Sequence, residues 1–120
     1  MNKSDYKELK IWQKGMILVE EVYKLIRILP PEEKFGLCDQ MRRCSVSIPS
    51  NIAEGHKRNS DKEFLHFLSI SKGSLGELET QLLLCQRLGY ADGRYVSELC
   101  SKVIEVDKMI AGLMTRISKL

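Results

Sequence analysis

Apolar residues recur at alternating spacings of three and four from Val96 to Leu120, and this pattern restricts the fold more than any other feature of the chain. The row consists of Val96, Leu99, Val103, Val106, Ile110, Leu113, Ile117 and Leu120. This spacing puts every apolar side chain on one face of a long helix, which other helices must then cover. Asp92 precedes the segment at a position where an aspartate side chain caps a helix. We therefore expect a helix from about Gly93 to Lys119.

Two further segments repeat the pattern. The first row consists of Leu9, Trp12, Met16, Val19, Tyr23 and Ile26, and the other of Phe64, Leu68, Ser71, Leu75, Leu78, Leu82 and Cys85. Pro30 and Pro31 end the first helix, and Pro31 suits the first turn of the next one. Ser60 and Glu63 form a capping-box pattern before the other row, and Gly89 supplies its C-terminal stop. No segment of the sequence alternates with the period of a β-strand, and the connections are short.

A less regular second helix contains the motif QMRRCSVSIPSNIAEG, from Gln40 to Gly55. Its apolar face consists of Phe35, Leu37, Cys38, Met41, Ile48 and Ile52. Pro49 interrupts this helix and frees a backbone carbonyl one turn earlier, which predicts a kink. The hydroxyls of Ser45 and Ser47 are near enough in sequence to help satisfy that carbonyl. The predicted fold is all-α: an antiparallel up-down-up-down four-helix bundle with a proline-kinked second helix, forming one domain over residues 1–120.

Small residues in the third helix would let it approach the second helix closely. They are Ser69, Ser71, Gly73, Ser74 and Gly76. The polar residues around this contact are Asn51, Glu54, Glu77, Glu79, Arg42 and Arg43. Buried charges cost free energy unless they are partnered. The polar residues therefore predict either a structural network or a site that faces a ligand.

The first helix carries a second apolar row beside the first. This row consists of Ile11, Leu18, Val22, Leu25 and Leu29. A helix with a single core-facing stripe does not need both rows. The two interpretations are a wide core stripe and a subunit interface of a homo-oligomer. On the second interpretation, the interface residues are Ile11, Leu18, Val22 and Leu25.

The composition is that of a soluble globular protein, with 43% hydrophobic and 29% charged residues. No apolar run is long enough to cross a membrane, and the polar N-terminus lacks a signal-peptide core. We therefore expect a cytoplasmic protein without membrane attachment. The four cysteines lie on or beside apolar stripes, which favours buried thiols over a disulfide or a metal site. They are Cys38, Cys44, Cys85 and Cys100.

No motif in the sequence points to an enzyme. Glu63 and His66 form one Glu-x-x-His pair, but di-iron bundles need two such pairs and further carboxylates. His56 lies at a helix end, where we expect it to face solvent. The sequence contains neither a glycine-rich phosphate loop nor a nucleophile motif. We therefore expect no catalytic residues, no metal and no other cofactor.

Basic residues in the first half of the chain are the best candidates for binding a partner. The net charge is +3, and residues 1–58 hold eleven Lys and Arg against eight Asp and Glu, whereas residues 59–120 hold eight of each. One stripe consists of Lys3, Lys7, Lys10 and Lys14, and a second cluster of Arg42, Arg43, His56, Lys57 and Arg58. Phosphate contacts require only cations on a presented surface. The lysines and arginines of both groups are the predicted nucleic-acid-binding residues, and the alternative is an ordinary solvated face.

Two long motifs carry a resemblance to a known family. QMRRCSVSIPSNIAEG and FLSISKGSLGELETQLLLCQRLGY resemble the four-helix bundle proteins encoded in 23S rRNA intervening sequences. LKIWQKGMILVEEVYKL and ILPPEEKFGL also fit, so the resemblance covers nearly the whole chain. It implies a homopentameric ring of bundles with a basic surface and no enzymatic activity. Cys44 departs from the family pattern, which usually has a small residue such as alanine there.

The resemblance and the basic residues lead to two functional hypotheses. The family includes the accessory variability protein of diversity-generating retroelements, which is thought to bind nucleic acid and a reverse transcriptase. The first hypothesis is a non-enzymatic oligomer that binds the backbone of RNA or DNA, with avidity from its repeated subunits. The rival is an interaction module that recruits another protein, such as a reverse transcriptase. Its expected signature is an apolar patch that oligomer formation leaves exposed.

Overall fold

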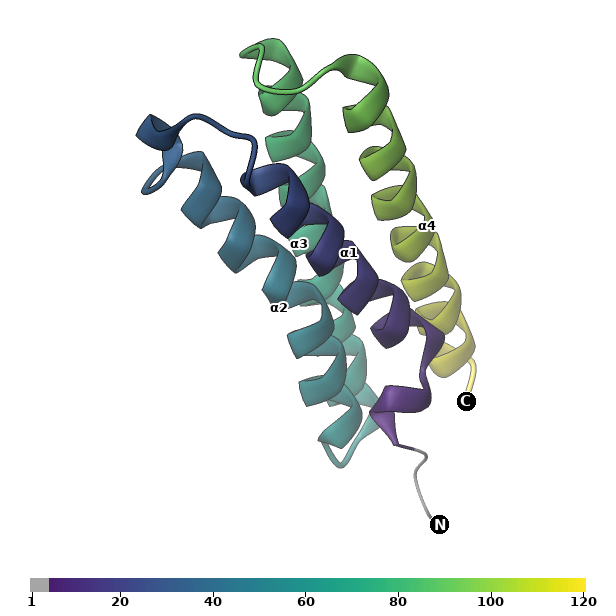
Figure 1. The fold of residues 1–120 in the computed structure, drawn as a ribbon. Coiled ribbons are helices and arrows are strands. Elements are labelled where there is room, and N and C mark those ends of the chain that lie inside the picture. Colours follow the sequence, from purple (N-terminus) through teal and green to yellow (C-terminus); the bar gives the residue numbers. More distant parts are fainter. Residues whose placement is uncertain (1–4) are drawn as a thin grey trace.

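Four helices make up most of the chain in the computed structural model, which describes residues 5–120 (Figure 1). They are α1 (Lys10–Ile26), α2 (Leu37–Lys57), α3 (Asp61–Arg87) and α4 (Gly93–Ser118). Two short 3-10 turns, η1 (Tyr6–Glu8) and η2 (Pro31–Glu33), precede α1 and α2. The bundle is elongated, with extents of 50 × 23 × 20 Å. The predicted all-α four-helix bundle is thereby confirmed.

Capping residues set the ends of α3 and α4. The Ser60 hydroxyl accepts a hydrogen bond from the Glu63 N–H (3.1 Å), and the Asp92 carboxylate accepts one from the Tyr95 N–H (2.8 Å). Each bond satisfies a backbone donor that the first turn of a helix leaves without a partner. Gly89 follows α3 with a φ of 79°, a backbone conformation that favours glycine. These predicted helix ends are confirmed.

A single hydrophobic core lies between the helices, and it includes residues from all four. α1 and α3 each pack against both α2 and α4, and successive helices run in opposite directions in Figure 1. The predicted apolar rows of α3 and α4 supply most of the buried residues of these helices. Leu120 is an exception, because it lies beyond the end of α4 and is 92% exposed.

The second apolar row of α1 belongs to this core. Ile11, Leu18, Val22 and Leu25 are at most 5% exposed, and Leu29 is buried with them. A subunit interface through these four residues is therefore wrong, since side chains inside one bundle cannot reach a second copy. The interpretation as part of the core is confirmed.

The first row of α1 lies at the edge of the core instead. Met16 and Tyr23 are 42% and 36% exposed, and Trp12 and Val19 are half-buried. Both rows satisfy the same spacing, so the spacing alone does not decide which row faces inward. The positions of α2 and α4 on either side of α1 decide it.

α2 begins at Leu37 rather than at the prolines. Pro31 opens η2, and the Glu33 side chain then accepts a hydrogen bond from the Leu37 N–H (3.1 Å), which caps α2 from outside the helix. Phe35 lies in this connection and is 86% exposed, so its placement on the apolar face of α2 is wrong. The separate turn at η2 is the cause, because it takes Phe35 out of the helical register.

Pro49 lies inside α2, which continues from Leu37 to Lys57. The kink at this proline stays a prediction. The hydroxyls of Ser45 and Ser47 donate to the carbonyls of Arg42 (3.2 Å) and Cys44 (2.7 Å), respectively. The carbonyl that loses its helical donor is that of Ser45, four residues before Pro49. The two hydroxyls therefore satisfy other carbonyls than the one we expected.

Two of the five predicted small residues of α3, Ser71 and Ser74, lie at its contact with α2. The expectation is wrong for Ser69, Gly73 and Gly76, which are exposed. The Ser71 hydroxyl donates to the Ile48 carbonyl (3.0 Å). The Cys44 thiol donates to the Ser74 carbonyl (3.0 Å), and the hydroxyls of Ser47 and Ser74 are hydrogen-bonded to each other. Polar bonds across a close helix contact leave little room for larger side chains at these positions.

The predicted polar network around this contact is wrong. Four of its six members have partners four residues away in the sequence: Asn51 with the Ser47 carbonyl (2.8 Å), Glu54 with Arg58 (2.8 Å), Glu77 with Gln81 (3.1 Å) and Arg43 with Asp39 (3.9 Å). Partners one turn away on the same helix are the closest ones available to an exposed or half-buried side chain. The proposed ligand-facing site loses its basis for the same reason.

Candidate nucleic-acid interface

The predicted lysine stripe is divided between two faces of the bundle. Lys3 lies outside the described residues. Lys7 belongs to η1, where its ammonium is 3.6 Å from the Asp5 carboxylate. The pKa of Asp5 is lowered, first by a hydrogen bond from the Lys7 backbone N–H and also by the charge of Lys57. Lys7 therefore lies near Lys57 at the end of α2, whereas Lys10 and Lys14 lie on the side of α1 that faces α4.

Lys14 lies on the side of α1 that faces α4. Its Nζ atom is 3.0 Å from Glu105 Oε1, and a second pair across the same helices joins Lys102 to Glu21 (3.9 Å). Exposed pairs of this kind contribute little to stability, on the order of 0–1 kcal/mol each. Their carboxylates nevertheless offset the two lysines, so Lys14 is a weaker candidate for binding phosphate.

A groove of about 460 Å³ separates the N-terminal end of α1 from the C-terminal half of α4. We call it the basic groove; it is lined by Glu8, Leu9, Lys10, Ile11, Lys108, Met109, Gly112, Leu113 and Arg116. Lys10, Lys108 and Arg116 are exposed, and within residues 5–120 none of them forms an ion pair. Three unpaired cations thus surround a floor that is largely apolar.

Helix geometry explains this convergence. Lys108, Gly112 and Arg116 are four residues apart and therefore share one face of α4. α1 begins at Lys10 without a side-chain cap and without an acidic residue in its first turn. The positive end of the α1 dipole is consequently not neutralised by its own helix, and it adds to the positive potential at the groove.

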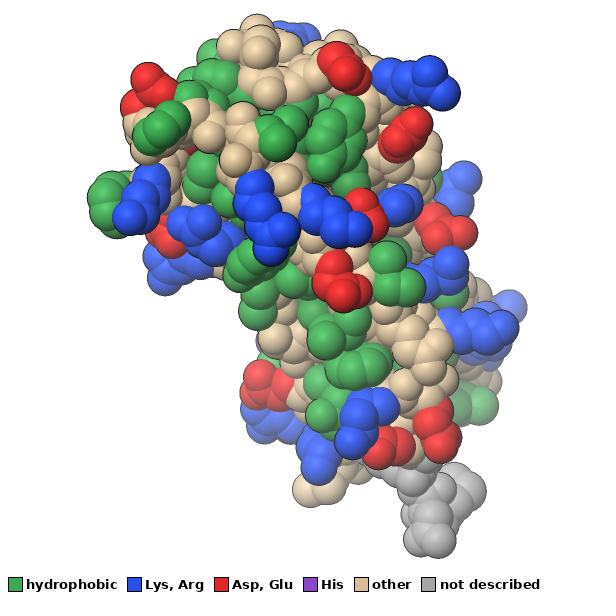
Figure 2. All heavy atoms as spheres, in the orientation of Figure 1, with side chains coloured by type: hydrophobic (Ala, Val, Ile, Leu, Met, Phe, Trp, Pro, Cys, Tyr) green, Lys and Arg blue, Asp and Glu red, His purple; other side chains and the backbone are tan. Residues whose placement is uncertain are grey.

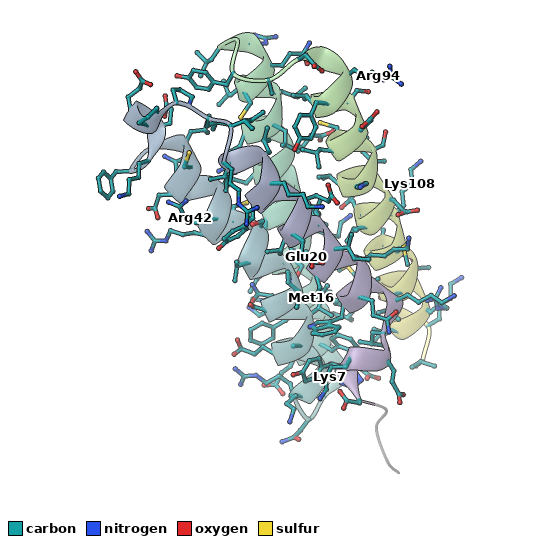
Figure 3. All side chains as sticks on the ribbon, viewed as in Figure 1. Lys7, Met16, Glu20, Arg42, Arg94 and Lys108 are labelled. Carbon is teal, nitrogen blue, oxygen red and sulfur yellow. The ribbon has the colours of Figure 1, made fainter. Side chains whose placement is uncertain are left out.

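The second basic cluster is not a single surface. Arg42 and Arg43 lie near the start of α2, whereas Lys57 ends it and Arg58 follows. The helix between the two pairs is about 21 Å long, at about 1.5 Å per residue. Figure 3 shows Arg42 beside the first half of α2 and Lys7 at the lower end of the bundle. Sequence separation alone therefore divides this cluster.

All three arginines of this cluster have partners, since Arg43 pairs with Asp39. Arg42 donates to the Lys34 carbonyl (3.2 Å), and Arg58 pairs with Glu54 (2.8 Å). His56 is only 8% exposed, and its ring packs edge-on against Phe64 at 5.6 Å between centroids. The expectation that His56 faces solvent is wrong, because α3 covers this end of α2.

A separate, exposed apolar surface lies between α1 and α2. We call it the apolar face; its groove of about 340 Å³ is lined by Tyr6, Trp12, Met16, Val19, Val46, Pro49, Ser50 and Ala53. Met16 and Val46 are 42% and 41% exposed. Figure 2 shows hydrophobic side chains gathered over the lower part of this side of the molecule, with basic side chains above and below them. A contiguous exposed apolar patch is typical of a surface that contacts another macromolecule.

The four cysteines belong to the packed interior of the bundle and not to either surface groove. Burial raises the pKa of Cys44 to about 12 and that of Cys85 to about 11, and Cys38 is buried as well. All four thiols are free, with Cys100 half-buried. Among residues 5–120, no three side chains gather as metal ligands, and no helix combines the length and hydropathy that a membrane crossing requires.

Comparison with known proteins decides the family. The model of the 23S rRNA-intervening sequence protein family matches residues 7–112. The chain belongs to this family. A crystal structure of a protein of unknown function from the S23 ribosomal protein family, from Bacteroides thetaiotaomicron, has the same fold. It superposes with a TM-score of 0.81 at 24% identity, covering 87% of this chain and 97% of that one. A search of curated proteins finds no match.

Lys108 and Arg116 are the basic residues of the groove that the sequence of this chain did not single out. Residues 59–120 hold equal numbers of basic and acidic residues, so charge counting gave no reason to select them. The predicted four-helix bundle was the one feature from which the proximity of these residues to Lys10 could have been inferred. The first and last helices of a four-helix bundle are neighbours when the loops are short, which brings the start of α1 beside the end of α4.

Proposed function

We propose that this protein is a non-enzymatic, oligomeric bundle that binds the phosphate backbone of RNA or DNA in the cytoplasm. The observation that carries the proposal is the convergence of Lys10, Lys108 and Arg116 on the basic groove, without carboxylate partners within residues 5–120. Cations of this kind bind phosphates by releasing the counterions around the nucleic acid. Glu8 is the acidic residue in the lining, so the groove keeps a positive balance.

We propose that copies of the chain associate through the apolar face. The proposal is supported by the exposure of Met16 and Val46, which line the same groove as Trp12. The second apolar row of α1 is buried in the core of the bundle and is not available for such a contact. The resemblance to ring-forming relatives favours a pentamer. Each added copy would bring another basic groove, and simultaneous binding at several grooves raises the overall affinity without any new contact.

Charge reversal tests the nucleic-acid proposal. The groove variant combines Lys10→Glu, Lys108→Glu and Arg116→Glu, and the matched control combines Lys34→Glu, Arg42→Glu and Arg43→Glu at the far end of the bundle. Fluorescence anisotropy with a labelled RNA hairpin should show roughly hundredfold weaker binding for the groove variant and a change of less than about threefold for the control. Equal losses in both variants, or unchanged binding by the groove variant, would contradict the assignment.

The second candidate function is recruitment of another protein, such as a reverse transcriptase. The observation that favours it is the apolar face, which one bundle leaves uncovered. If the protein is monomeric in solution, this face is free for a partner of another kind. Loss of nucleic-acid binding together with a monomeric state would therefore favour recruitment over the first proposal.

A further inference from the structure

The basic groove has a floor that phosphate binding does not require. Leu9, Ile11, Met109 and Leu113 supply apolar lining below the three cations. Contact with the backbone of a duplex needs only cations on a presented surface. A duplex also keeps its bases stacked, so the faces of its bases are not available to such a floor. The groove is therefore suited to a ligand that carries both phosphates and an exposed apolar surface.

An unpaired nucleotide has this combination of chemistry. Its phosphates are anionic, and the faces of its base are apolar once the base is unstacked. Single-stranded nucleic acids bind proteins in positively charged grooves where the bases pack on flat side chains. A volume of about 460 Å³ also lies within the usual range of small-ligand sites.

Arg116 provides a flat, charged group at this groove. Its guanidinium Nη1 lies 3.8 Å from the position that a Cβ atom on Gly112 would occupy, so it extends over the glycine. A guanidinium plane stacks on a nucleobase and binds phosphate, whereas a lysine ammonium does only the latter. Arg116 thus suits the junction between base and backbone.

Gly112 keeps the floor of the groove open. Glycine weakens the interior of a helix relative to alanine, and Gly112 lies well inside α4. Its position demands no close approach within residues 5–120, since an added Cβ would find only Arg116 Nη1 within 4 Å. A larger side chain there would occupy the groove without changing its charge. Gly112 therefore offers a way to separate occupancy of the groove from electrostatic attraction.

We infer that the basic groove holds an unpaired nucleotide of single-stranded RNA or DNA, with its base on the apolar floor and its flanking phosphates on Lys10, Lys108 and Arg116. This inference rests on the proposed function and narrows its ligand. It predicts a preference for single strands over duplexes of the same sequence. It also predicts that filling the groove removes this preference while the charge of the protein is unchanged.

Anisotropy titrations with a labelled single-stranded RNA and with its duplex form test the inference. The wild type should bind the single strand about tenfold more tightly than the duplex at matched salt. Gly112→Leu should weaken single-strand binding to the duplex level and leave duplex binding unchanged. The control is Gly73→Leu, also a glycine inside a long helix, where an added Cβ would meet nothing within 4 Å among residues 5–120. It should bind both RNAs as the wild type does.

A second variant keeps the test decisive if Gly112→Leu does not fold, as judged by circular dichroism. Arg116→Lys retains the charge but removes the planar group, and it should weaken single-strand binding severalfold with little change for the duplex. Equal affinity of the wild type for both RNAs would overturn the inference and leave the proposed function standing. Single-strand binding that is unchanged in both Gly112→Leu and Arg116→Lys would likewise overturn the inference and leave the proposed function standing. Absence of binding to either RNA would overturn both.

Discussion

Gly55 ends the QMRRCSVSIPSNIAEG motif at a point where α2 and α3 are in contact. A Cβ atom built on it would lie 2.6 Å from Phe67 Cβ and 3.1 Å from Phe64 Cδ1. Phe67 Cβ is attached directly to the backbone, so it cannot move aside without a shift of α3. Gly76 on α3 differs, because an added Cβ would meet no atom within 4 Å in the described part of the chain.

Alanine substitutions should therefore have opposite effects at these two glycines. Gly55→Ala should destabilise the protein by about 1–3 kcal/mol, the usual cost of overpacking, and lower Tm by roughly 3–10 °C. Gly76→Ala should stabilise it by up to about 1 kcal/mol through the higher helix propensity of alanine. Thermal unfolding followed by circular dichroism measures both changes. A neutral or stabilising Gly55→Ala would show that the helices do not approach as closely as described.

At the scale of whole elements, Glu33 connects three parts of the bundle. Its carboxylate accepts hydrogen bonds from the Tyr90 hydroxyl (2.7 Å) and from the Leu37 N–H (3.1 Å). η2, the start of α2 and the connection between α3 and α4 are thereby joined. The Tyr90 bond, followed by the Leu37 bond, lowers the pKa of Glu33 from its ordinary value of 4.5.

The lowered pKa of Glu33 predicts a dependence of stability on pH. The folded state favours the carboxylate, so this contribution is complete above about pH 4.5 and is lost as the pH falls through the lower pKa of the folded state. Tm of the wild type should therefore fall more between about pH 6 and about pH 3 than Tm of Glu33→Gln or Tyr90→Phe. Parallel curves for all three proteins would show that these hydrogen bonds contribute nothing.

The sequence predicts the lengths and ends of helices better than their rotation. Ser60 and Asp92 begin α3 and α4 by hydrogen bonds to backbone N–H groups three residues later, and Gly89 follows α3 with a positive φ. These effects are local, so the residue types alone predict them. The side of α1 that faces the core is set by the neighbouring helices, because both of its apolar rows recur with the periodicity of a helix. Phe35 was misplaced because the Glu33 cap that starts α2 depends on a side chain outside the helix. Tertiary contacts therefore decide what periodicity leaves open.

At the scale of the whole molecule, we propose self-association through the apolar face instead of through the buried row of α1. Met16→Glu with Val46→Glu should convert an oligomer into a monomer of 13.8 kDa, because two charges would be buried at the interface. Light scattering measures the mass. The matched control is Ile70→Glu with Leu84→Glu on α3, whose side chains are 39% and 41% exposed. A monomeric wild type, or an oligomer that survives the first pair of changes, would contradict the assignment.

The candidate site could be predicted from the sequence only in part. Lys10 was identified because it belongs to the predicted lysine stripe, but Lys108 and Arg116 are more than ninety positions away in the chain. Their proximity arises from the packing of α1 on α4, which local patterns do not contain. Lys7 was chosen as a member of the lysine stripe and Arg58 as a member of the second basic cluster, and the structure gives both of them acidic partners.

The most direct test of the central claim is the salt dependence of RNA binding, measured from about 50 to about 300 mM salt. For the wild type, the logarithm of the affinity should fall linearly with the logarithm of the salt concentration. Lys10→Ala, Lys108→Ala and Arg116→Ala together should reduce the magnitude of that slope by about two, since each phosphate contact to a single strand contributes about 0.7. Absence of binding at the lowest salt, or an unchanged slope in the variant, would contradict the claim that the basic groove binds phosphates.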